Sequence, residues 1–260
     1  MGNIAKNMNN YKKQLLSILE IPEECNNSNN EEKEKIIDWG QVTDIFGDGS
    51  CVAYFPFNNS YEDMLGVSEA EGFNGVEFVT EEDNNVYAKG GAEYNTHIKV
   101  YSLPINIFTS TNVAFSFFGK VFEAGKSAYF ICSGSKPDLS GSPSVFIKSD
   151  YIGQYAMHAL SFDRNYNDGN VHFFVFTVSD GVLKVYVDNV LSVSDNRKSI
   201  HIDVSYTYPS LNIYSLLQNQ YISHYGGNRS FAQISRFRVF NRGLTEDEVN
   251  ELYLKEKGEF

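Results

Sequence analysis

The stretch RVFNRGLTEDEVNELY, residues 238–253, decides the fold prediction, because it passes from a strand pattern into a well-defined helix start. At the beginning of this stretch, Phe237 and Val239 fall on one face of a strand, and we expect both to face a core. Arg236 and Arg238 alternate with them and are expected to face water. The corner at residues 242–243 then leads into the helix.

The helix start is defined by its capping residues. Thr245 is a suitable N-cap, and Glu248, three residues later, completes a capping box. Leu244 and Val249 flank the cap as a hydrophobic staple, and the acids of the first turn suit the positive end of the helix dipole. The acidic run therefore predicts a short helix that packs against the domain, and it does not predict a catalytic site.

Composition excludes several classes of function. The chain has 260 residues with 20 Phe and 17 Tyr, which favours strands, and its net charge of −12 argues against nucleic-acid binding. Three separated cysteines predict free thiols. We find neither a signal-peptide core nor a membrane-spanning run, so we expect no membrane insertion. The predicted location is a virion or extracellular particle, and otherwise the cytoplasm.

The chain divides into two parts that differ in composition and hydrophobic pattern. Residues 1–39 contain Tyr11, Leu15, Ile18 and Leu19 at helical spacing, followed by the polar run CNNSNNEEKEK. We predict an N-terminal helical segment with a polar linker here, serving either as an amphipathic cover or as a segment for docking or homo-oligomerisation. Residues 40–260 show short alternating runs and are predicted to form one domain.

The clearest strand signal is VHFFVFTVSDGVLKVYVDNVLSV, residues 171–193. Two strands meet at Asp180-Gly181, where a positive φ costs little, and a second tight turn follows at Asp188-Asn189. Many strands spaced in this way without helices between them predict an all-β fold. We expect an antiparallel two-sheet sandwich, with a short N-terminal helical segment and a short C-terminal helix.

These patterns resemble a known family. The stretch RFRVFNRGLTEDEVNELY is similar to the end of the laminin-G-like jelly roll in the concanavalin A-like lectin and glucanase superfamily. CVAYFPFNNSYEDMLG, residues 51–66, is similar to its first strand, with Phe57, Asp63 and Gly66 at the expected places. HFFVFTVSDGVLKVYVDNVL is similar to its central hairpin, although Asn189 replaces the usual glycine. The resemblance implies a jelly-roll sandwich.

A narrower resemblance concerns the setting of the domain. WGQVTDIFGDGS, residues 39–50, is similar to the start of such jelly rolls in bacteriophage tail and particle proteins. That resemblance implies a phage-like particle, to whose other proteins residues 1–39 would attach the domain.

Glycosidases of this superfamily hold carboxylates on one strand at E-x-D-x-E or E-x-D-x-x-E spacing. TEEDNN, residues 80–85, offers Glu81, Glu82 and Asp83 without a further acid at that spacing, and it is typical of a turn. GKVFEAGKSAYF, residues 119–130, misses the P-loop spacing by one residue and is expected to be a hairpin turn between strands. We therefore predict a protein that is not an enzyme.

The resemblance also implies a calcium site at the rim of the sandwich. Members of this fold often bind one Ca²⁺ through a carboxylate near the first strand and backbone carbonyls, and Asp63 matches the position of that carboxylate. Hard cations need several oxygen ligands, which such a loop can supply. The alternative is that Asp63 is a turn-forming residue.

Glycan binding requires rings that stack on sugar faces and polar groups that pair with hydroxyls. Two tyrosine-rich stretches are expected to be exposed loops, although tyrosines in such stretches can instead pack inside the fold. The predicted ligand-binding residues are Tyr221, His224, Tyr225, Asn228 and Arg229 in the later stretch, and Tyr155 and His158 in the earlier one.

Taken together, these features predict a non-catalytic binding or adhesion module that recognises a glycan or a cell-surface receptor. One alternative is a structural particle protein that uses the jelly roll for assembly. The other is a glycan hydrolase or lyase whose site has no recognisable motif.

Overall fold

The computed structural model describes residues 39–82, 84–90, 96–123, 129–133, 145–154, 157–196, 200, 213–217 and 231–258. By internal contacts, Trp39–Phe260 forms one unit. The predicted N-terminal helix and its docking role fall on residues outside the described part, so both stay predictions. No helix in the described ranges is long and apolar enough to cross a membrane.

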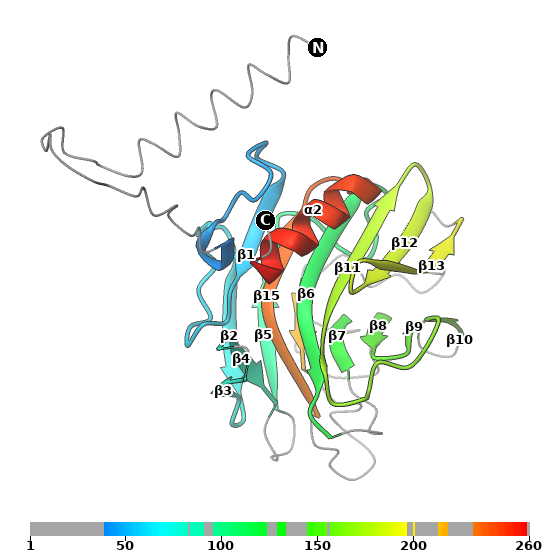
Figure 1. Ribbon diagram of the computed structural model, residues 1–260. Coiled ribbons are helices and arrows are strands. Elements are labelled where there is room, and N and C mark those ends of the chain that lie inside the picture. Colours follow the sequence, from blue (N-terminus) through cyan, green and yellow to red (C-terminus); the bar gives the residue numbers. More distant parts are fainter. Residues whose placement is uncertain are drawn as a thin grey trace, which may run out of the picture. The chain divides into compact units, whose positions relative to one another are not determined.

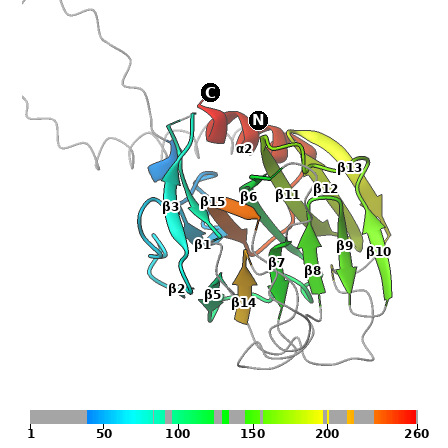
Figure 2. The same cartoon turned by 90° about the horizontal axis from the view of Figure 1, so that it is seen from below.

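Two antiparallel sheets form the two main layers of this unit (Figures 1 and 2). Sheet A has the order β13-β12-β11-β6-β15-β4-β3, with β1 paired to β15, and sheet B has the order β10-β9-β8-β7-β14-β5-β2. Sheet A contains β1 (Cys51–Phe55), β3 (Glu77–Thr80), β4 (Val86–Lys89), β6 (Val113–Val121), β11 (Val171–Ser179), β12 (Val182–Val187), β13 (Val190–Asp195) and β15 (Ala232–Phe240). Sheet B contains β2 (Glu69–Phe73), β5 (His97–Tyr101), β7 (Tyr129–Ser133), β8 (Val145–Lys148), β9 (Tyr151–Gln154), β10 (Met157–Ser161) and β14 (Ile213–Leu216). The predicted all-β, antiparallel two-sheet fold is confirmed.

Aromatic rings fill the space between the sheets. Phe117 of β6 stacks on Phe174 of β11 with ring centroids 5.1 Å apart, and it reaches Phe130 of β7 across the sandwich at 5.4 Å. Gly119 makes room for this contact, because a Cβ there would lie 2.9 Å from the Phe130 ring. The inner core therefore depends on large rings opposite a residue without a side chain.

The two predicted tight turns of residues 171–193 are confirmed. Asp180 and Gly181 have φ values of 51° and 75°, and Asp188 and Asn189 have φ values of 50° and 64°. The strands on either side pair in register, with Phe174 opposite Val187 and Ser179 opposite Val182.

The stretch 119–130 is not the hairpin that the sequence predicts. Strands flank it on both sides, as expected, but β6 ends at Val121 in sheet A and β7 begins at Tyr129 in sheet B. The chain therefore crosses from one sheet to the other between them. An alternating hydrophobic pattern identifies strands but does not identify their partners, which explains this error.

A helix, α2 (Glu246–Lys257), covers the outer face of sheet A (Figure 2). Its predicted capping box is present, because Thr245 Oγ1 accepts from the Glu248 amide and the Glu248 carboxylate accepts from the Thr245 amide. Leu244 and Val249 are buried on either side of the cap. A short 3₁₀ helix, η1 (Trp39–Gln41), precedes the first strand. The helix start read from the sequence is confirmed.

The expectation that Arg236 and Arg238 face water is wrong. Arg238 is fully buried, and its Nε donates to Glu256 Oε1 at 2.6 Å. Arg236 has a φ of 50° at a shift of register between Ser235 and Arg238, and its guanidinium donates to Glu256 Oε2 at 3.1 Å. Both arginines do point away from the inner core, but α2 covers that face, so they meet a carboxylate instead of solvent.

Candidate functional site

The predicted glycan-binding residues are not tested by the described structure. Tyr155, Tyr221, His224, Tyr225, Asn228 and Arg229 lie outside the described residues. His158 belongs to β10, and only its backbone is described. The expectation that the earlier stretch is an exposed loop is wrong, because β9 and β10 lie in it. These seven assignments therefore stay predictions.

The strands that border the two stretches leave sheet B at different ends. The strand register aligns the end of β9 with the start of β14, through Gln154, Val145, Ser133 and Tyr214 in turn. β9 therefore ends at the same end of sheet B at which β14 begins. The later stretch follows Leu216, at the end of β14. The described strand ends next to the two stretches therefore lie at opposite ends of sheet B.

Asp63 lies at the rim after β1, where it holds a loop together. Its Oδ1 accepts from the amides of Tyr54 at 2.9 Å and Leu65 at 3.1 Å. Its Oδ2 accepts from the amides of Val67 at 3.1 Å and Ser68 at 2.9 Å. Each oxygen thus has two backbone partners, which is the geometry of a turn-forming residue. In the described ranges no group of three His, Cys, Asp or Glu side chains could hold a metal ion. Calcium binding stays a prediction.

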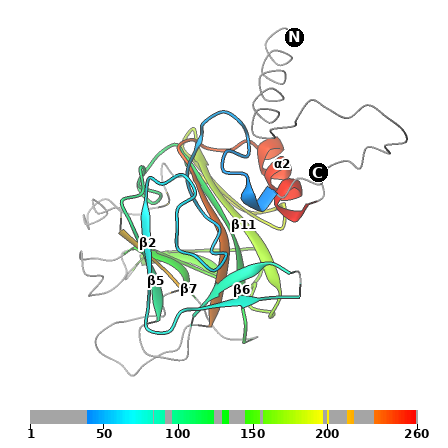
Figure 3. The ribbon, with the colours of Figure 1, turned by 90° about the vertical axis from the view of Figure 1, so that its left-hand side faces the viewer.

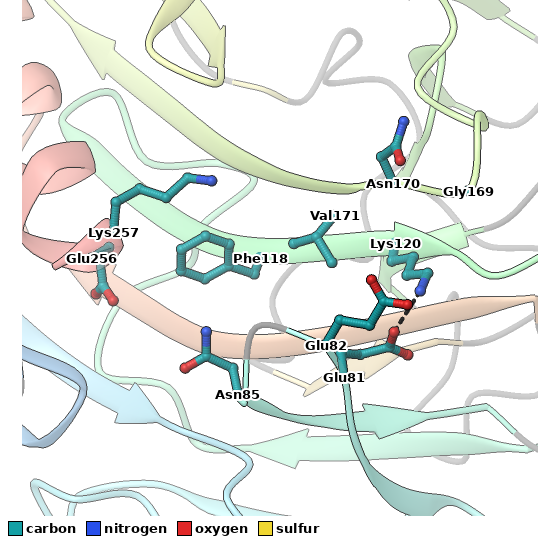
Figure 4. A pocket seen from close by; sticks show the side chains of 10 residues that line it. All are labelled: Glu81, Glu82, Asn85, Phe118, Lys120, Gly169, Asn170, Val171, Glu256 and Lys257. Carbon is teal, nitrogen blue, oxygen red and sulfur yellow. Dashed lines mark hydrogen bonds and ion pairs between the residues drawn. The ribbon is translucent and has the colours of Figure 1, made fainter. Parts of the chain in front are cut away.

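A cleft of about 470 Å³ opens on the outer face of sheet A, beside the end of α2 (Figure 4). We call it the α2 cleft. It is lined by Glu81, Glu82, Asn85, Phe118, Lys120, Gly169, Asn170, Val171, Glu256 and Lys257. No residue of the predicted site is among them. The cleft is assembled from four separate parts of the chain.

The turn between β3 and β4 forms one wall of the α2 cleft. Asn84 has a φ of 59°, and the Glu81 amide donates to the Asn85 carbonyl at 3.0 Å, which confirms the turn predicted for TEEDNN. Glu81 Oε2 pairs with Lys120 Nζ at 2.6 Å. Asn85 Oδ1 accepts from Arg236 at 2.6 Å, which fixes the orientation of the amide. The tight turn thus presents polar side chains to the cleft from fixed positions.

Two charged groups of the cleft have no ion pair with any residue in the described ranges. Glu81 pairs with Lys120, and the Glu256 carboxylate is held by two arginines. Glu82 and Lys257 make no such pair, and Figure 4 shows them on different sides of the Phe118 ring. The cleft therefore offers a carboxylate, an ammonium group and two amides over an aromatic floor.

A histidine between two aspartates secures the wall at Gly169 and Asn170. His172 Nδ1 lies 2.6 Å from Asp188 Oδ2, and its Nε2 lies 3.0 Å from Asp168 Oδ1. Asp168 Oδ1 also accepts from the Asn170 amide at 2.9 Å. Only the protonated imidazolium can donate to both carboxylates. This cluster was not predicted from the sequence. The predicted hairpin could have revealed it, because its register places His172 next to the turn at Asp188.

The charges of this cluster shift its pKa values. Burial lowers the pKa of His172, but the hydrogen bonds to Asp188 and Asp168 outweigh burial and raise it above its usual value. Burial raises the pKa of Asp168, but the Asn170 amide and His172 outweigh burial and lower it to about 2. The ion pairs therefore persist over a wide range of acidic pH.

We expect replacement of His172 by glutamine to destabilise the domain more at about pH 6 than at about pH 9. The folded pKa of His172 is raised, so its stabilising effect is complete below the unfolded pKa and is lost as the pH rises through the folded value. Urea unfolding of both proteins at the two pH values measures the difference. An equal loss of stability at both would contradict a charged His172.

Comparisons with known proteins identify the fold. No protein-family model matches the chain, and no curated protein matches it by sequence. Among solved structures, it is similar to domain 4 of AbnA, an extracellular GH43 arabinanase from Geobacillus stearothermophilus, in complex with arabinotriose. The identity is 16%, the TM-score is 0.55, and the match covers 78% of this chain and 98% of that one.

Two other solved structures give similar matches. Trypanosoma rangeli sialidase in complex with 2,3-difluoro-KDN matches at 14% identity with a TM-score of 0.60, over 97% of this chain and 39% of the sialidase. The binding domain of botulinum neurotoxin serotype D matches at 16% identity with a TM-score of 0.53, over 78% of this chain and 51% of that one. At such identities these likenesses show the fold alone, and the chain is a two-sheet antiparallel β-sandwich.

Proposed function

We propose that this domain is a non-catalytic glycan-binding module and that the α2 cleft is its sugar-binding site. The observation that carries the proposal is the grouping of Glu82, Asn85, Asn170 and Lys257 around the ring of Phe118. Carboxylates accept from sugar hydroxyls, ammonium groups donate to them, and amides do both. The Phe118 ring beneath these groups is 3% exposed and packs against Phe173 and Arg236, so it supports the polar groups and leaves recognition of the sugar to them.

The size and construction of the cleft support this proposal. Small-molecule sites usually enclose roughly 300–1,000 Å³ and contain a few polar groups in fixed positions. The cleft has about 470 Å³. The Arg236 contact fixes Asn85, and the Asp168 contact fixes the backbone at Asn170. A ligand would therefore meet groups that are already in place, which reduces the entropy lost on binding.

Two of the similar structures contain sugar ligands. Domain 4 of AbnA was solved with arabinotriose, and its whole length is nearly matched by this chain. The sialidase was solved with 2,3-difluoro-KDN, although the match spans only 39% of that enzyme. These ligands belong to those proteins, and they motivate the choice of glycans as the ligand class to test.

The contacts of the carboxylates favour binding over hydrolysis. Hydrolysis of a glycosidic bond generally needs two carboxyl groups, one on each side of the bond. In the cleft, Glu81 is engaged by Lys120, and Glu256 is engaged by Arg236 and Arg238. Glu82 is thus the one carboxylate of the cleft without an ion pair in the described ranges. A hydrolase would release reducing sugar from a bound polysaccharide, and we expect none.

The proposed setting of the module is a phage-like particle. Its support is the resemblance to laminin-G-like jelly rolls and to the start of such domains in phage proteins, together with residues 1–39, which would attach it to other particle proteins. Co-purification of the full chain with tail or capsid proteins from a particle preparation tests this setting.

A glycan array followed by calorimetry tests the binding function. We expect Glu82→Gln to weaken binding of the best array ligand about tenfold or more and Asn170→Ala to weaken it about fivefold, because a hydrogen bond to a charged group contributes about 1.5–3 kcal/mol and a neutral one about 1 kcal/mol. Glu77→Gln is the matched control, because Glu77 is exposed in β3 and does not line the cleft.

Three outcomes would count against the proposal. Equal binding by wild type and both cleft variants would move the sugar site elsewhere, first to the tyrosine-rich stretches. Absence of any array ligand, combined with a stable higher oligomer, would favour a structural particle protein. Release of reducing sugar that Glu82→Gln abolishes would favour a hydrolase.

A further inference from the structure

A second hollow, of about 590 Å³, lies at the rim beside β2 and shares no residue with the α2 cleft. We call it the rim hollow. It is lined by Tyr61, Glu62, Asp63, Gly66, Ser68, Glu69 and Ala70. We propose that the rim hollow receives a lysine or arginine side chain from an extended segment of a partner protein, which runs along the open edge of β2.

The wall of the rim hollow is rigid before any partner binds. The four backbone amides that donate to Asp63 fix the loop from residue 63 to residue 68. Gly66 completes the loop with a φ of 67°, which other residues rarely adopt. A preformed wall reduces the entropy that is lost on binding. Because its oxygens already accept from amides, Asp63 acts here as a support for the loop.

The floor of the rim hollow suits the hydrocarbon stem of a long basic side chain. Tyr61 and Ala70 are partly buried and pack against the inner core. The Tyr61 ring lies 5.0 Å from the Phe78 ring, and it also lies against Gly72, where a Cβ would meet the tyrosine hydroxyl at 2.0 Å. The floor is therefore apolar and fixed in place. Lysine and arginine bury their stems on such surfaces and leave their charge at the edge.

The charge at the edge of the hollow is negative and unpaired. Glu62 and Glu69 line the hollow and are exposed, and neither makes an ion pair with another residue in the described ranges. Glu71 follows on β2 and is also exposed without such a pair, but Lys99 of β5 stands opposite it in the strand register. The uncompensated charge is therefore that of Glu62 and Glu69. Complementary charge raises association rates and selects partners, so these carboxylates favour a basic segment.

Exposed apolar side chains stand beside these charges. Met64 is 42% exposed and Val67 is 57% exposed, and both belong to the loop that Asp63 holds. In the described ranges only two other large hydrophobic residues are as open, Val190 and Leu191 on β13. Exposed apolar groups rimmed by charge are typical of protein contact surfaces.

The edge of β2 provides main-chain groups for an extended partner. Among the described strands, β2 pairs only with β5 and stands at the end of sheet B (Figure 3). An extended segment can add to such an edge through backbone hydrogen bonds. Glu69 and Glu71 would repel the same acidic edge of a second copy, so the charge favours a basic partner over self-association.

Peptide titration tests the proposal without reference to glycan binding. The probe is an eight-residue peptide of alternating lysine and valine, and the control peptide alternates glutamate and valine. We expect only the lysine peptide to bind, with amide NMR shifts concentrated in residues 61–73. Its affinity should fall as NaCl rises from about 50 to about 500 mM, because salt screens exposed charges.

Matched variants locate the contact. The double variant Glu62→Gln/Glu69→Gln should weaken peptide binding about tenfold, and Val67→Ser should weaken it by a smaller factor. Glu77→Gln removes one exposed charge outside the hollow, and Glu82→Gln removes one in the α2 cleft, so both should bind the peptide within about twofold of wild type. If the protein binds no glycan but shows this pattern of peptide binding, the proposal for the rim hollow is supported and the proposed glycan function is not.

Several results would overturn the proposal. One is no binding of the lysine peptide, and another is equal binding by the Glu62→Gln/Glu69→Gln variant. A third is a shift of the same amides by CaCl₂ with no effect of the peptide, which would make the hollow a cation site. Dimerisation of the free protein that Val67→Ser abolishes would make the edge a contact between two copies.

Discussion

Replacement of Glu256 by glutamine is expected to lower the free energy of unfolding by about 3–5 kcal/mol. The Glu256 side chain is fully buried between two guanidinium groups, 2.6 Å from Arg238 Nε and 3.1 Å from Arg236. Glutamine keeps the shape but removes the negative charge, so Arg238 would remain buried without its counter-charge. The carbonyls of Val42 and Thr43, which also accept from Arg238, offset only part of this loss.

Urea unfolding measures the effect of Glu256→Gln, and Glu246→Gln is the matched control. Glu246 lies on the same helix, is exposed and makes no ion pair in the described ranges. A carboxylate in the first turn of a helix contributes about 0.3–1 kcal/mol. A similar small loss in both variants would show that the buried carboxylate does not anchor α2 to the sheet.

Replacement of Asp63 by alanine is expected to lower the free energy of unfolding by about 3 kcal/mol. The change removes the acceptors of four backbone amides, of which those of Tyr54 and Ser68 belong to buried residues. Each buried donor left without a partner costs about 1–3 kcal/mol, and loss of the loop's exposed hydrogen bonds adds less. The loop that walls the rim hollow should loosen as a result.

Thermal unfolding with and without a chelator separates this structural role from the predicted calcium site. If Asp63 acts through backbone amides, Asp63→Ala should destabilise the protein equally in EDTA and in about 1 mM CaCl₂, a concentration at which extracellular calcium modules bind. A loss confined to the calcium buffer would assign Asp63 to the metal. Asp63→Asn is the matched variant, because it keeps one acceptor oxygen and should lose less stability.

Local sequence was sufficient wherever the physics is local. The capping box at Thr245 and Glu248 involves atoms three residues apart, and the turns at Asp180 and Asp188 depend on which residues tolerate a positive φ. Each prediction required only neighbouring residues. The alternating pattern of β12 also agrees with the structure. Leu183 and Val185 belong to the inner core, and Tyr186 belongs to the hydrophobic cluster beneath α2.

The errors arose where a distant segment determined the environment. Alternation correctly placed Arg238 on the outer face of its strand, but only the packing of α2 converts that face from solvent to a second core. Similarly, the strands flanking residues 119–130 were predicted, but their assignment to different sheets depends on partners far along the chain. A local pattern does not contain that information.

The two hollows show the same division. Asp63 was selected from the sequence, whereas its four amide partners emerged only when the loop closed around it. The α2 cleft joins Glu82, Lys120, Asn170 and Lys257, which are separated by tens of residues, and no spacing rule connects them. The strands, the tight turns and the capped helix could be predicted from local sequence, because these features depend on neighbouring residues. The sheet order, the buried ion pairs and the cleft became visible only in the folded chain, because each depends on which distant segments meet.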